Sequence, residues 1–382
     1  MFRSFYLAGF ECATGRNMHG EWIDQIAATG HDLHADADYA LLAQAGIHAV
    51  REAIRWPLVD RGGEFDFACA APFAQAAVRH GFDVIWDLFH YGYPENLDPF
   101  DRATFVPRFA AYCRAAARFV ARYGDGTHYF TPVNEPSFFA WAGGEAGRFA
   151  PHARGRGFEL KVALAHAAIE GIAAIREELP DARIVNVDPI CRVVAPSGAD
   201  AHALEHARQF NEEWVFEFWD IVGGRKMPQL GGSPGHLDIV GINYYWTNQW
   251  ELGSEGVPLG DHDPRRVPLS QLVRDAWRRY GHDIVITETS ALGDARAPWI
   301  GELSAMSGQL IAQGVPLHGI CLYPILGMPE WHARDQWALM GLWDLEREGD
   351  LLHRRPCSPG LLALQAAQRA VPLRRGPRKP RA

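Results

Sequence analysis

Eight short apolar runs alternate with stretches of helical periodicity along nearly the whole chain, and this alternation restricts the possible folds more than any other feature. A strand, a helix and a second strand in succession form parallel pairs through a right-handed crossover. Eight such units predict a parallel sheet that closes into a barrel. The runs are Phe5–Phe10, Ile47–Trp56, Phe82–Phe89, Tyr129–Val133, Ile184–Val187, Leu237–Tyr245, Ile284–Thr287 and Leu317–Tyr323.

The helical stretches repeat apolar residues three and four positions apart, as expected for helices that cover a sheet. We therefore expect a single α/β domain over residues 1–372, a (β/α)₈ TIM barrel. The alternative is an open doubly wound sheet, but no G-x-G-x-x-G sequence follows the first run. Residues 373–382 are basic and proline-containing, which predicts a disordered tail. The helical stretches are 36–45, 65–80, 105–123, 160–178, 201–222, 271–280, 299–313 and 358–370.

Composition narrows the classes of partner and the compartment. Hydrophobic residues make up 48% and charged residues 22%, as in a soluble enzyme. A net charge of −9 argues against nucleic acid or an anionic membrane as a partner. The six cysteines are scattered, and neither a signal peptide nor a run long enough to cross a bilayer is evident. We therefore expect a cytoplasmic protein with reduced thiols; the sequence leaves its oligomeric state open.

Two glutamates lie where a barrel of this kind carries its chemistry. Glu135, in Asn134-Glu135-Pro136, ends the fourth run, and Glu288 ends the seventh. Because the carboxyl ends of barrel strands face the catalytic loops, the two can converge over one cavity. Either one alone is more simply interpreted as part of a rim salt bridge. Together they fit glycoside hydrolysis, in which one carboxylic acid protonates the leaving oxygen and one carboxylate attacks carbon or activates water.

Charged and polar side chains inside or just after the second and third runs add to this candidate site. Arg51 lies within the second run, where a charge is costly unless it is paired. Contact with Glu288 would supply the pair, and so would a salt bridge to Glu52 or Asp87. His90 ends the third run and would either hydrogen-bond sugar hydroxyls or be a satisfied core histidine.

Further candidates follow the fourth, sixth and eighth runs. The Asn134 amide could bind a sugar hydroxyl next to the scissile bond. Tyr245 could donate to the nucleophile carboxylate, although a strand aromatic can also simply fill a core. Tyr323 ends the eighth run, and Glu330-Trp331 follows it. An indole face can stack on a pyranose while a carboxylate accepts from two hydroxyls.

Metal and phosphate chemistry find no support in the sequence. His31-x-x-His34 and Glu330-Trp331-His332 are the compact candidates, and neither joins a third ligand at a recognisable spacing. No glycine-rich phosphate loop is present either. We expect no metal and no other cofactor.

Taken in order, these segments resemble glycoside hydrolase family 1, the β-glucosidase-like branch of the clan A retaining glycosidases. The resemblance covers residues 5–356. It implies that Glu135 is the acid/base, that Glu288 is the nucleophile, and that the protein cleaves β-linked glycosides in carbohydrate metabolism through a covalent glycosyl-enzyme. The matching segments are Arg51, Trp56, His90, Asn134-Glu135-Pro136, Gly143-Gly144, Phe149-Ala150-Pro151-His152, Asn243-Tyr244-Tyr245, Thr287-Glu288 and Glu330-Trp331.

Some positions depart from the family pattern. Glu11 lies near the place of the family's glutamine, Tyr323 replaces a tryptophan, and Arg55 replaces a small residue. These changes touch the residues that recognise the sugar. The sugar, the linkage, exo or endo action, and hydrolysis or transglycosylation therefore stay open. The alternatives are an endo-acting clan A glycanase and a sugar-binding barrel that has lost efficient catalysis.

Overall fold

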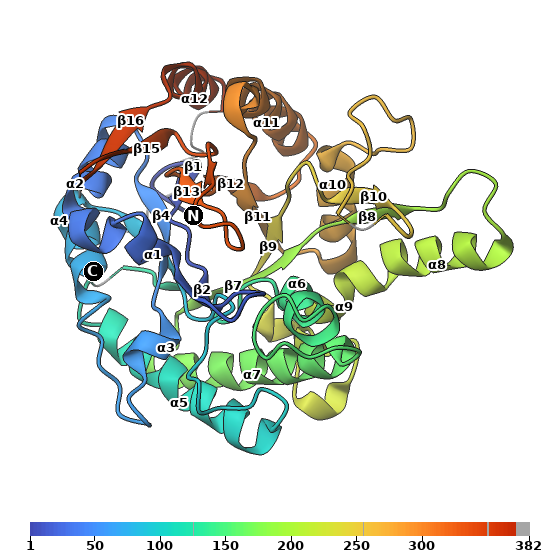
Figure 1. Ribbon diagram of the computed structural model, residues 1–382, viewed down its shortest axis with the longest axis horizontal. Helices are drawn as coiled ribbons and strands as arrows, with labels where there is room; N and C mark the ends of the chain where they lie inside the picture. The colour runs from blue at the N-terminus through green and yellow to red at the C-terminus, as the bar shows by residue number, and fades with distance from the viewer. Residues whose placement is uncertain (125, 255, 350, 372–382) are drawn as a thin grey trace.

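The computed structural model describes residues 1–371 except 125, 255 and 350, and its centre is a closed parallel barrel (Figure 1). Around the barrel the strands follow the order β1-β12-β11-β9-β7-β6-β5-β4. The expected (β/α)₈ fold is confirmed, and each apolar run coincides with one barrel strand. The strands are β1 (Tyr6–Gly9), β4 (Ala49–Ala53), β5 (Asp83–Asp87), β6 (Tyr129–Thr131), β7 (Arg183–Pro189), β9 (Ile239–Asn243), β11 (Asp283–Thr289) and β12 (Leu317–Leu322).

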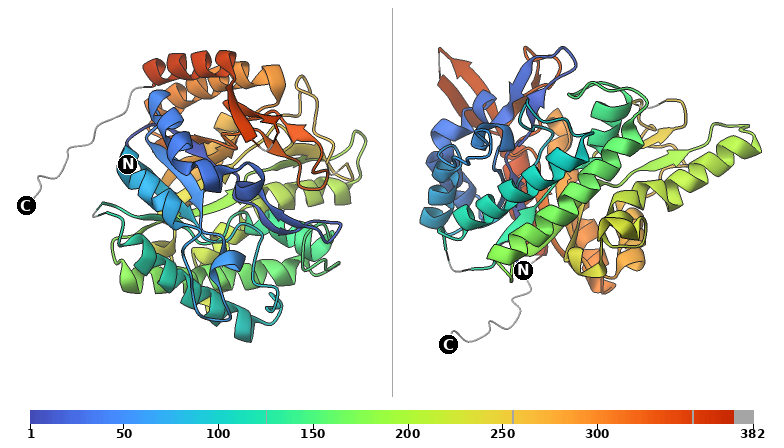
Figure 2. Two further views of the ribbon diagram at one scale, coloured as in Figure 1. Left: turned by 60° about the vertical axis from the view of Figure 1, so that its left-hand side comes forward. Right: turned by 90° about the horizontal axis from the view of Figure 1, so that it is seen from below.

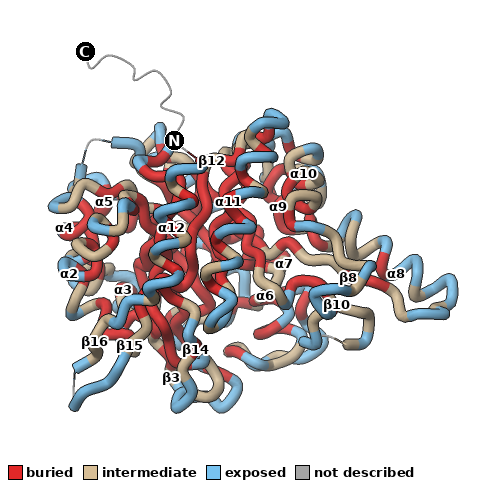
Figure 3. Tube along the Cα trace, turned by 90° about the horizontal axis from the view of Figure 1, so that it is seen from above, coloured by how far each residue is buried: buried red, intermediate tan, exposed pale blue. Residues whose placement is uncertain are grey.

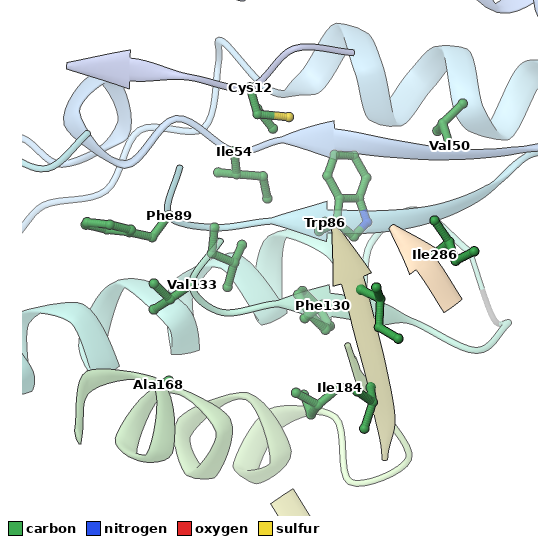
Figure 4. Close-up of a cluster of buried hydrophobic side chains, with 14 of the residues drawn as sticks. Cys12, Val50, Ile54, Trp86, Phe89, Phe130, Val133, Ala168, Ile184 and Ile286 are labelled. Carbon is green, nitrogen blue, oxygen red and sulfur yellow. The ribbon is translucent and has the colours of Figure 1, made fainter. Parts of the chain in front are cut away.

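Side chains of the barrel strands divide between two apolar layers, because successive residues of a strand face opposite sides. Along β5, Ile85 belongs to the inner layer and Trp86 to the layer between barrel and helices. The same alternation separates Val185 from Ile184 on β7. Figure 4 shows part of the outer layer, where Phe130 and Ile184 lie near the helix that carries Ala168.

Helices surround the barrel, and Figure 3 shows burial concentrated in the strands and on the inward sides of these helices. Helices α5 and α7 lie side by side; a Cβ on Gly171 would lie 3.0 Å from Cys113 Sγ, so a glycine permits their close approach. The α-helices are α1 (Gln25–Ala28), α2 (His31–Gln44), α3 (Trp56–Val59), α4 (Ala71–His80), α5 (Arg102–Val120), α6 (Pro136–Phe139), α7 (Gly157–Glu178), α8 (Ala201–Glu212), α9 (Glu217–Val222), α10 (Leu269–Tyr280), α11 (Arg296–Ala312) and α12 (Ser358–Ala370).

The prediction of one continuous helix over 201–222 is wrong. Helix α8 ends at Glu212, a 3₁₀ turn spans Trp214–Phe216, and α9 begins at Glu217. Helix α8 extends away from the barrel beside β8 and β10 (Figure 1; Figure 2, right) and buries one residue, Ala207. Helix α9 instead buries five of its six residues. The chain changes direction between them because the two halves have different packing partners.

The long connections that follow β6 and β12 contain structure of their own. The first carries α6 and a π-helix over Ala140–Glu145. The second folds into two hairpins. The strands outside the barrel are β2 (Thr14–Arg16), β3 (Trp22–Asp24), β8 (Arg192–Val194), β10 (Gln249–Glu251), β13 (Met328–Pro329), β14 (Trp337–Ala338), β15 (Trp343–Glu348) and β16 (Leu351–Pro356). Further 3₁₀ turns span Pro228–Leu230, Pro234–His236 and Gly293–Ala295.

Three observations bear on the remaining expectations. None of the six cysteines forms a disulfide. Among the described residues, no helix has both the length and the apolar character needed to cross a membrane. The basic tail 373–382 and residue 372, the expected end of the domain, lie outside the described residues.

Candidate active site

Glu135 and Glu288 both lie at the carboxyl end of the barrel. Glu135 follows β6 and precedes α6, with a left-handed backbone (φ +45°). Glu288 lies near the end of β11, directly after a register shift against β9 that begins at Ile286. Such irregularities re-aim a side chain at the end of a strand. Both side chains are nearly buried, with 7% of Glu135 and 3% of Glu288 exposed.

The Glu288 carboxylate is held by a cation and a phenol. Arg51 Nη1 lies 2.5 Å from Oε1, and the Tyr245 hydroxyl donates to Oε2 at 3.0 Å. The other end of the guanidinium, Nη2, donates to Asp87 Oδ2 at 2.5 Å and to Asn134 Oδ1 at 2.6 Å. The sequence left open whether Arg51 pairs with the nucleophile candidate or with Asp87; in the structure one fully buried cation serves both carboxylates.

The Glu135 carboxyl has neutral hydrogen-bond donors and an anionic neighbour. Asn243 Nδ2 donates to Oε1 at 2.9 Å, and the Tyr91 hydroxyl donates to Oε2 at 2.7 Å. Burial and then the charge of Glu288 raise the pKa of Glu135 to about 8, while the two hydrogen bonds and the charge of His90 act in the opposite direction. A carboxyl group that keeps its proton near neutral pH is suited to general acid catalysis.

His90 contacts Asp87 and Asn134, and both of these residues accept hydrogen bonds from Arg51. Its Nδ1 lies 3.0 Å from Asp87 Oδ2, and Asn134 Nδ2 lies 3.0 Å from its Nε2. Because Arg51 donates to Asn134 Oδ1, the Asn134 amide donates to Nε2, which must then be unprotonated. Burial lowers the pKa of His90, but the carboxylates of Asp87 and Glu11 outweigh it and raise the value. The contact with Asn134 fits the neutral ring, whereas the raised pKa favours the protonated ring, whose charge is the one that acts on Glu135 and Glu11.

Glu11 lies next to this network. Its Oε1 accepts from the Ala13 amide at 3.0 Å and lies 3.7 Å from His90 Nε2. Burial raises the pKa of Glu11 to about 7; His90 opposes the rise and Glu288 adds to it. A carboxyl group that titrates near neutrality thus occupies the place where the resemblance implies an amide.

Tyr323 is enclosed by the barrel. Its hydroxyl accepts from the Cys12 amide at 2.9 Å, its ring lies parallel to that of His90, and 1% of it is exposed. A Cβ on Gly9 would lie 2.0 Å from the Tyr323 ring, so only a glycine fits there. The structure therefore gives Tyr323 a supporting position beneath the polar groups.

The Glu330-Trp331 step divides between two environments. The Trp331 ring is half-buried, with ring centroids 5.7 Å from Tyr91 and 5.6 Å from Phe149. Its indole N–H is buried and has no acceptor among the described residues. The Glu330 side chain is exposed, without a hydrogen bond or ion pair to a described residue. The structure thus brings Trp331 toward Glu135 through Tyr91 and leaves Glu330 in solvent.

Within the described part of the chain, one group of side chains could approach a metal: Cys12, Asp87 and His90 are buried, with ligand atoms within 4.8 Å of one another. Asp87 and His90 are already hydrogen-bonded to each other, and Arg51 contacts the same Asp87 oxygen. A metal ion would have to compete with this guanidinium. The donor set is therefore better explained by the ion-pair network.

Sequence reasoning missed Tyr91, which makes the shortest hydrogen bond to Glu135. The available signal was its place directly after His90 at the end of a barrel strand. The catalytic and substrate-binding roles of the other candidates stay predictions, although the structure gathers Arg51, Asn134, Asn243 and Tyr245 around the two glutamates.

Comparisons with known proteins agree with this geometry. The model of the family described as glycosyl hydrolase family 1 matches residues 10–226. The aryl-phospho-beta-D-glucosidase BglC of Bacillus subtilis is 24% identical over 264 residues, which cover 61% of this chain and 55% of that protein. The coniferin beta-glucosidase of Pinus contorta is 25% identical over 254 residues, or 55% of this chain and 49% of that one. The chain therefore spans about half the length of the curated relatives it matches.

Solved structures extend the likeness over the whole fold. The beta-glucosidase from Thermotoga maritima in complex with azafagomine superposes with a TM-score of 0.77 at 17% identity, covering 97% of this chain and 98% of that chain. Its complex with deoxynojirimycin gives a TM-score of 0.78 at 16% identity. At this identity the likeness is one of fold. The family model, which matches more than half of the chain, carries the assignment: the chain belongs to glycosyl hydrolase family 1.

Proposed function

We propose that the protein is a retaining β-glycosidase that hydrolyses O-glycosidic bonds, with Glu288 as nucleophile and Glu135 as acid/base. One observation carries the proposal: two buried carboxyl groups at the same end of the barrel have opposite electrostatic surroundings. Glu288 contacts the Arg51 guanidinium, whereas burial and Glu288 itself raise the pKa of Glu135 to about 8. Pairs of carboxyl groups divided in this way are the acid and base pairs of glycosidases.

In the first step, a Glu288 oxygen forms a bond to the anomeric carbon while the bond from that carbon to the leaving oxygen breaks. The proton of Glu135 passes to the leaving oxygen. In the second step, Glu288 is esterified and uncharged, so Glu135 loses the anionic neighbour that raised its pKa. Glu135 can then take a proton from water as the water oxygen attacks the anomeric carbon and releases Glu288. Two inversions leave the β configuration unchanged.

The substrate class we infer is a β-glucoside or a related β-linked glycoside or oligosaccharide. The names of the relatives support it, since they include a coniferin beta-glucosidase and an aryl-phospho-beta-D-glucosidase. The exposed Glu330 and the carboxyl group of Glu11 leave the choice of sugar to experiment. A cytoplasmic location belongs to the same proposal, supported by six cysteines without a disulfide.

The experiment compares wild type with Glu288→Gln and Glu135→Ala on aryl β- and α-glycosides. Glu288→Gln should abolish turnover of the β-glycosides. Glu135→Ala should retain activity best on substrates with good leaving groups, and azide should raise the turnover of this variant by forming a β-glycosyl azide. Near wild-type rates for Glu288→Gln would contradict the proposal. So would an α-configured first product from a β-glycoside in proton NMR. Absence of any aryl-glycoside turnover would favour a sugar-binding barrel instead.

A further inference from the structure

Two residues of the site share an uncommon backbone conformation, and their side chains bind each other. Tyr91 has φ +70° and Glu135 has φ +45°, and the described residues include only two other non-glycine positions with positive φ, His152 and Met227. Such conformations are disfavoured for residues with a Cβ and cluster at functional sites. Here the two meet in one hydrogen bond, from the Tyr91 hydroxyl to Glu135 Oε2 at 2.7 Å.

Aromatic contacts hold the Tyr91 ring in place. It is buried, stacks on Phe139 with centroids 5.6 Å apart and an angle of 18°, and meets Trp331 edge-on. Phe139 ends α6, the helix that begins directly after Glu135. The ring therefore packs against the same short helix that sets the position of the carboxyl group.

The two oxygens of Glu135 are not equivalent. Thr287 Oγ1 donates to Asn243 Oδ1 at 2.7 Å, so the amide nitrogen of Asn243 faces Glu135 Oε1. An amide nitrogen can only donate. A hydroxyl can donate to a carboxylate and accept from a carboxylic acid. The Asn243 amide therefore keeps its hydrogen bond in the acid form only when the proton lies on Oε2, where the Tyr91 hydroxyl can accept from the acid and donate to the carboxylate.

We propose that Tyr91 is a positioning residue for the acid/base: its hydroxyl fixes the orientation of Glu135, directs the transferable proton to Oε2 and stabilises the carboxylate left after proton transfer. This inference rests on the proposed function of the same site.

The charged and titratable groups that face Glu135 come from four elements. Glu288 on β11 is the anion that raises its pKa, and His90 after β5 opposes that effect. Tyr245 after β9 and Cys191 after β7 also face it; burial raises the pKa of both, so they are uncharged near neutral pH. Tyr91 supplies a hydrogen bond that counteracts burial. Its removal should therefore raise the pKa of Glu135.

The test is Tyr91→Phe, which keeps the ring contacts and removes the hydroxyl. The matched control is Tyr93→Phe, on the same loop, because the Tyr93 hydroxyl has no hydrogen-bond partner among the described residues. We expect the basic limb of the kcat/KM profile for an aryl β-glucoside to move upward by about one pH unit in Tyr91→Phe, as for loss of one hydrogen bond to a charged group. The control should follow wild type.

A second measurement separates this inference from the proposed function. The carboxyl carbon of ¹³C-labelled Glu135, assigned by its loss in Glu135→Gln, can be titrated by NMR without any turnover. An upward shift in Tyr91→Phe supports the inference even if no glycoside is cleaved, in which case the proposed function alone fails. An unchanged or lowered titration midpoint in Tyr91→Phe would overturn the inference.

Should Tyr91→Phe not fold, 3-fluorotyrosine at position 91 keeps every contact and makes the hydroxyl a stronger donor. The Glu135 midpoint should then move downward. A midpoint that stays in place or rises would count against Tyr91 as the donor that stabilises the carboxylate.

Discussion

Replacing Arg51 by methionine tests the ion-pair network that joins the proposed nucleophile to Asp87. Arg51 is fully buried and contacts both Asp87 and Glu288 at 2.5 Å. Its loss leaves two buried carboxylates, each with one remaining donor: His90 for Asp87 and Tyr245 for Glu288. Breaking a buried pair in this way costs about 3–5 kcal/mol of unfolding free energy. Because each carboxylate keeps one donor, we expect the loss of unfolding free energy to lie near the lower end of this range, at about 3 kcal/mol.

The assay is urea unfolding at pH 7, followed by circular dichroism. Arg118→Met is the matched control, because Arg118 pairs with Glu178 on the surface and its removal should leave the midpoint near wild type. The double variant Arg51→Met/Asp87→Asn should recover part of the loss, since one uncompensated charge is removed. A loss below about 1 kcal/mol for Arg51→Met would refute the reasoning, because a paired buried charge is worth more than that. So would a double variant less stable than the single one.

Three further predictions concern buried groups. Burial lowers the pKa of His31, but Glu52 and Asp38 outweigh it and raise the pKa to about 9, above the unfolded value near 6.5. The stability that the charged His31 contributes is therefore fully present below about pH 6.5 and is lost as the pH rises through about 9. In His31→Gln the urea midpoint should fall less steeply between these pH values than in wild type. A fall as steep as in wild type would contradict the network. Burial raises the pKa of Glu11 from 4.5 to about 7, so its contribution to stability is present below about pH 4.5 and is lost as the pH rises toward 7. Glu11→Gln should reduce the drop in melting temperature between pH 5 and pH 8. A drop equal to that of wild type would show that Glu11 is not the group responsible. Gly9→Ala places a methyl carbon 2.0 Å from the Tyr323 ring; overpacking of this kind costs about 1–3 kcal/mol, and a wild-type melting temperature would show that the ring has room to move.

The barrel strands could be predicted because they are buried on both faces and appear as continuous apolar runs. Ile184–Val187 is one such run, and it lies within β7. Helices that lie on the barrel were also evident from their periodicity. The break at Glu213 was not, because it depends on what α8 and α9 pack against. Packing partners from distant segments are absent from a local window of sequence.

The candidate site divides in the same way. Glu135, Glu288 and Arg51 stand out because a charged residue in or at the end of an apolar strand needs an explanation. The sequence could not show that Arg51 serves both carboxylates, since β4, β5 and β11 meet only when the barrel closes. Tyr91 escaped notice because its role depends on a left-handed backbone turn and on a partner 44 residues away. The exposed position of Glu330 likewise depends on how its loop folds.

The register of β4 joins the stability of the barrel to its chemistry. Arg51 and Glu52 are adjacent, so they face opposite sides of the strand. Arg51, opposite Ile85 of β5, reaches Asp87 and Glu288 inside the barrel. Glu52 binds His31 at 3.0 Å on the outer side. A slip of one residue would exchange the two, placing an anion beside the proposed nucleophile and a cation beside His31. Both networks therefore select the same register, because a slip that broke one of them would break the other as well.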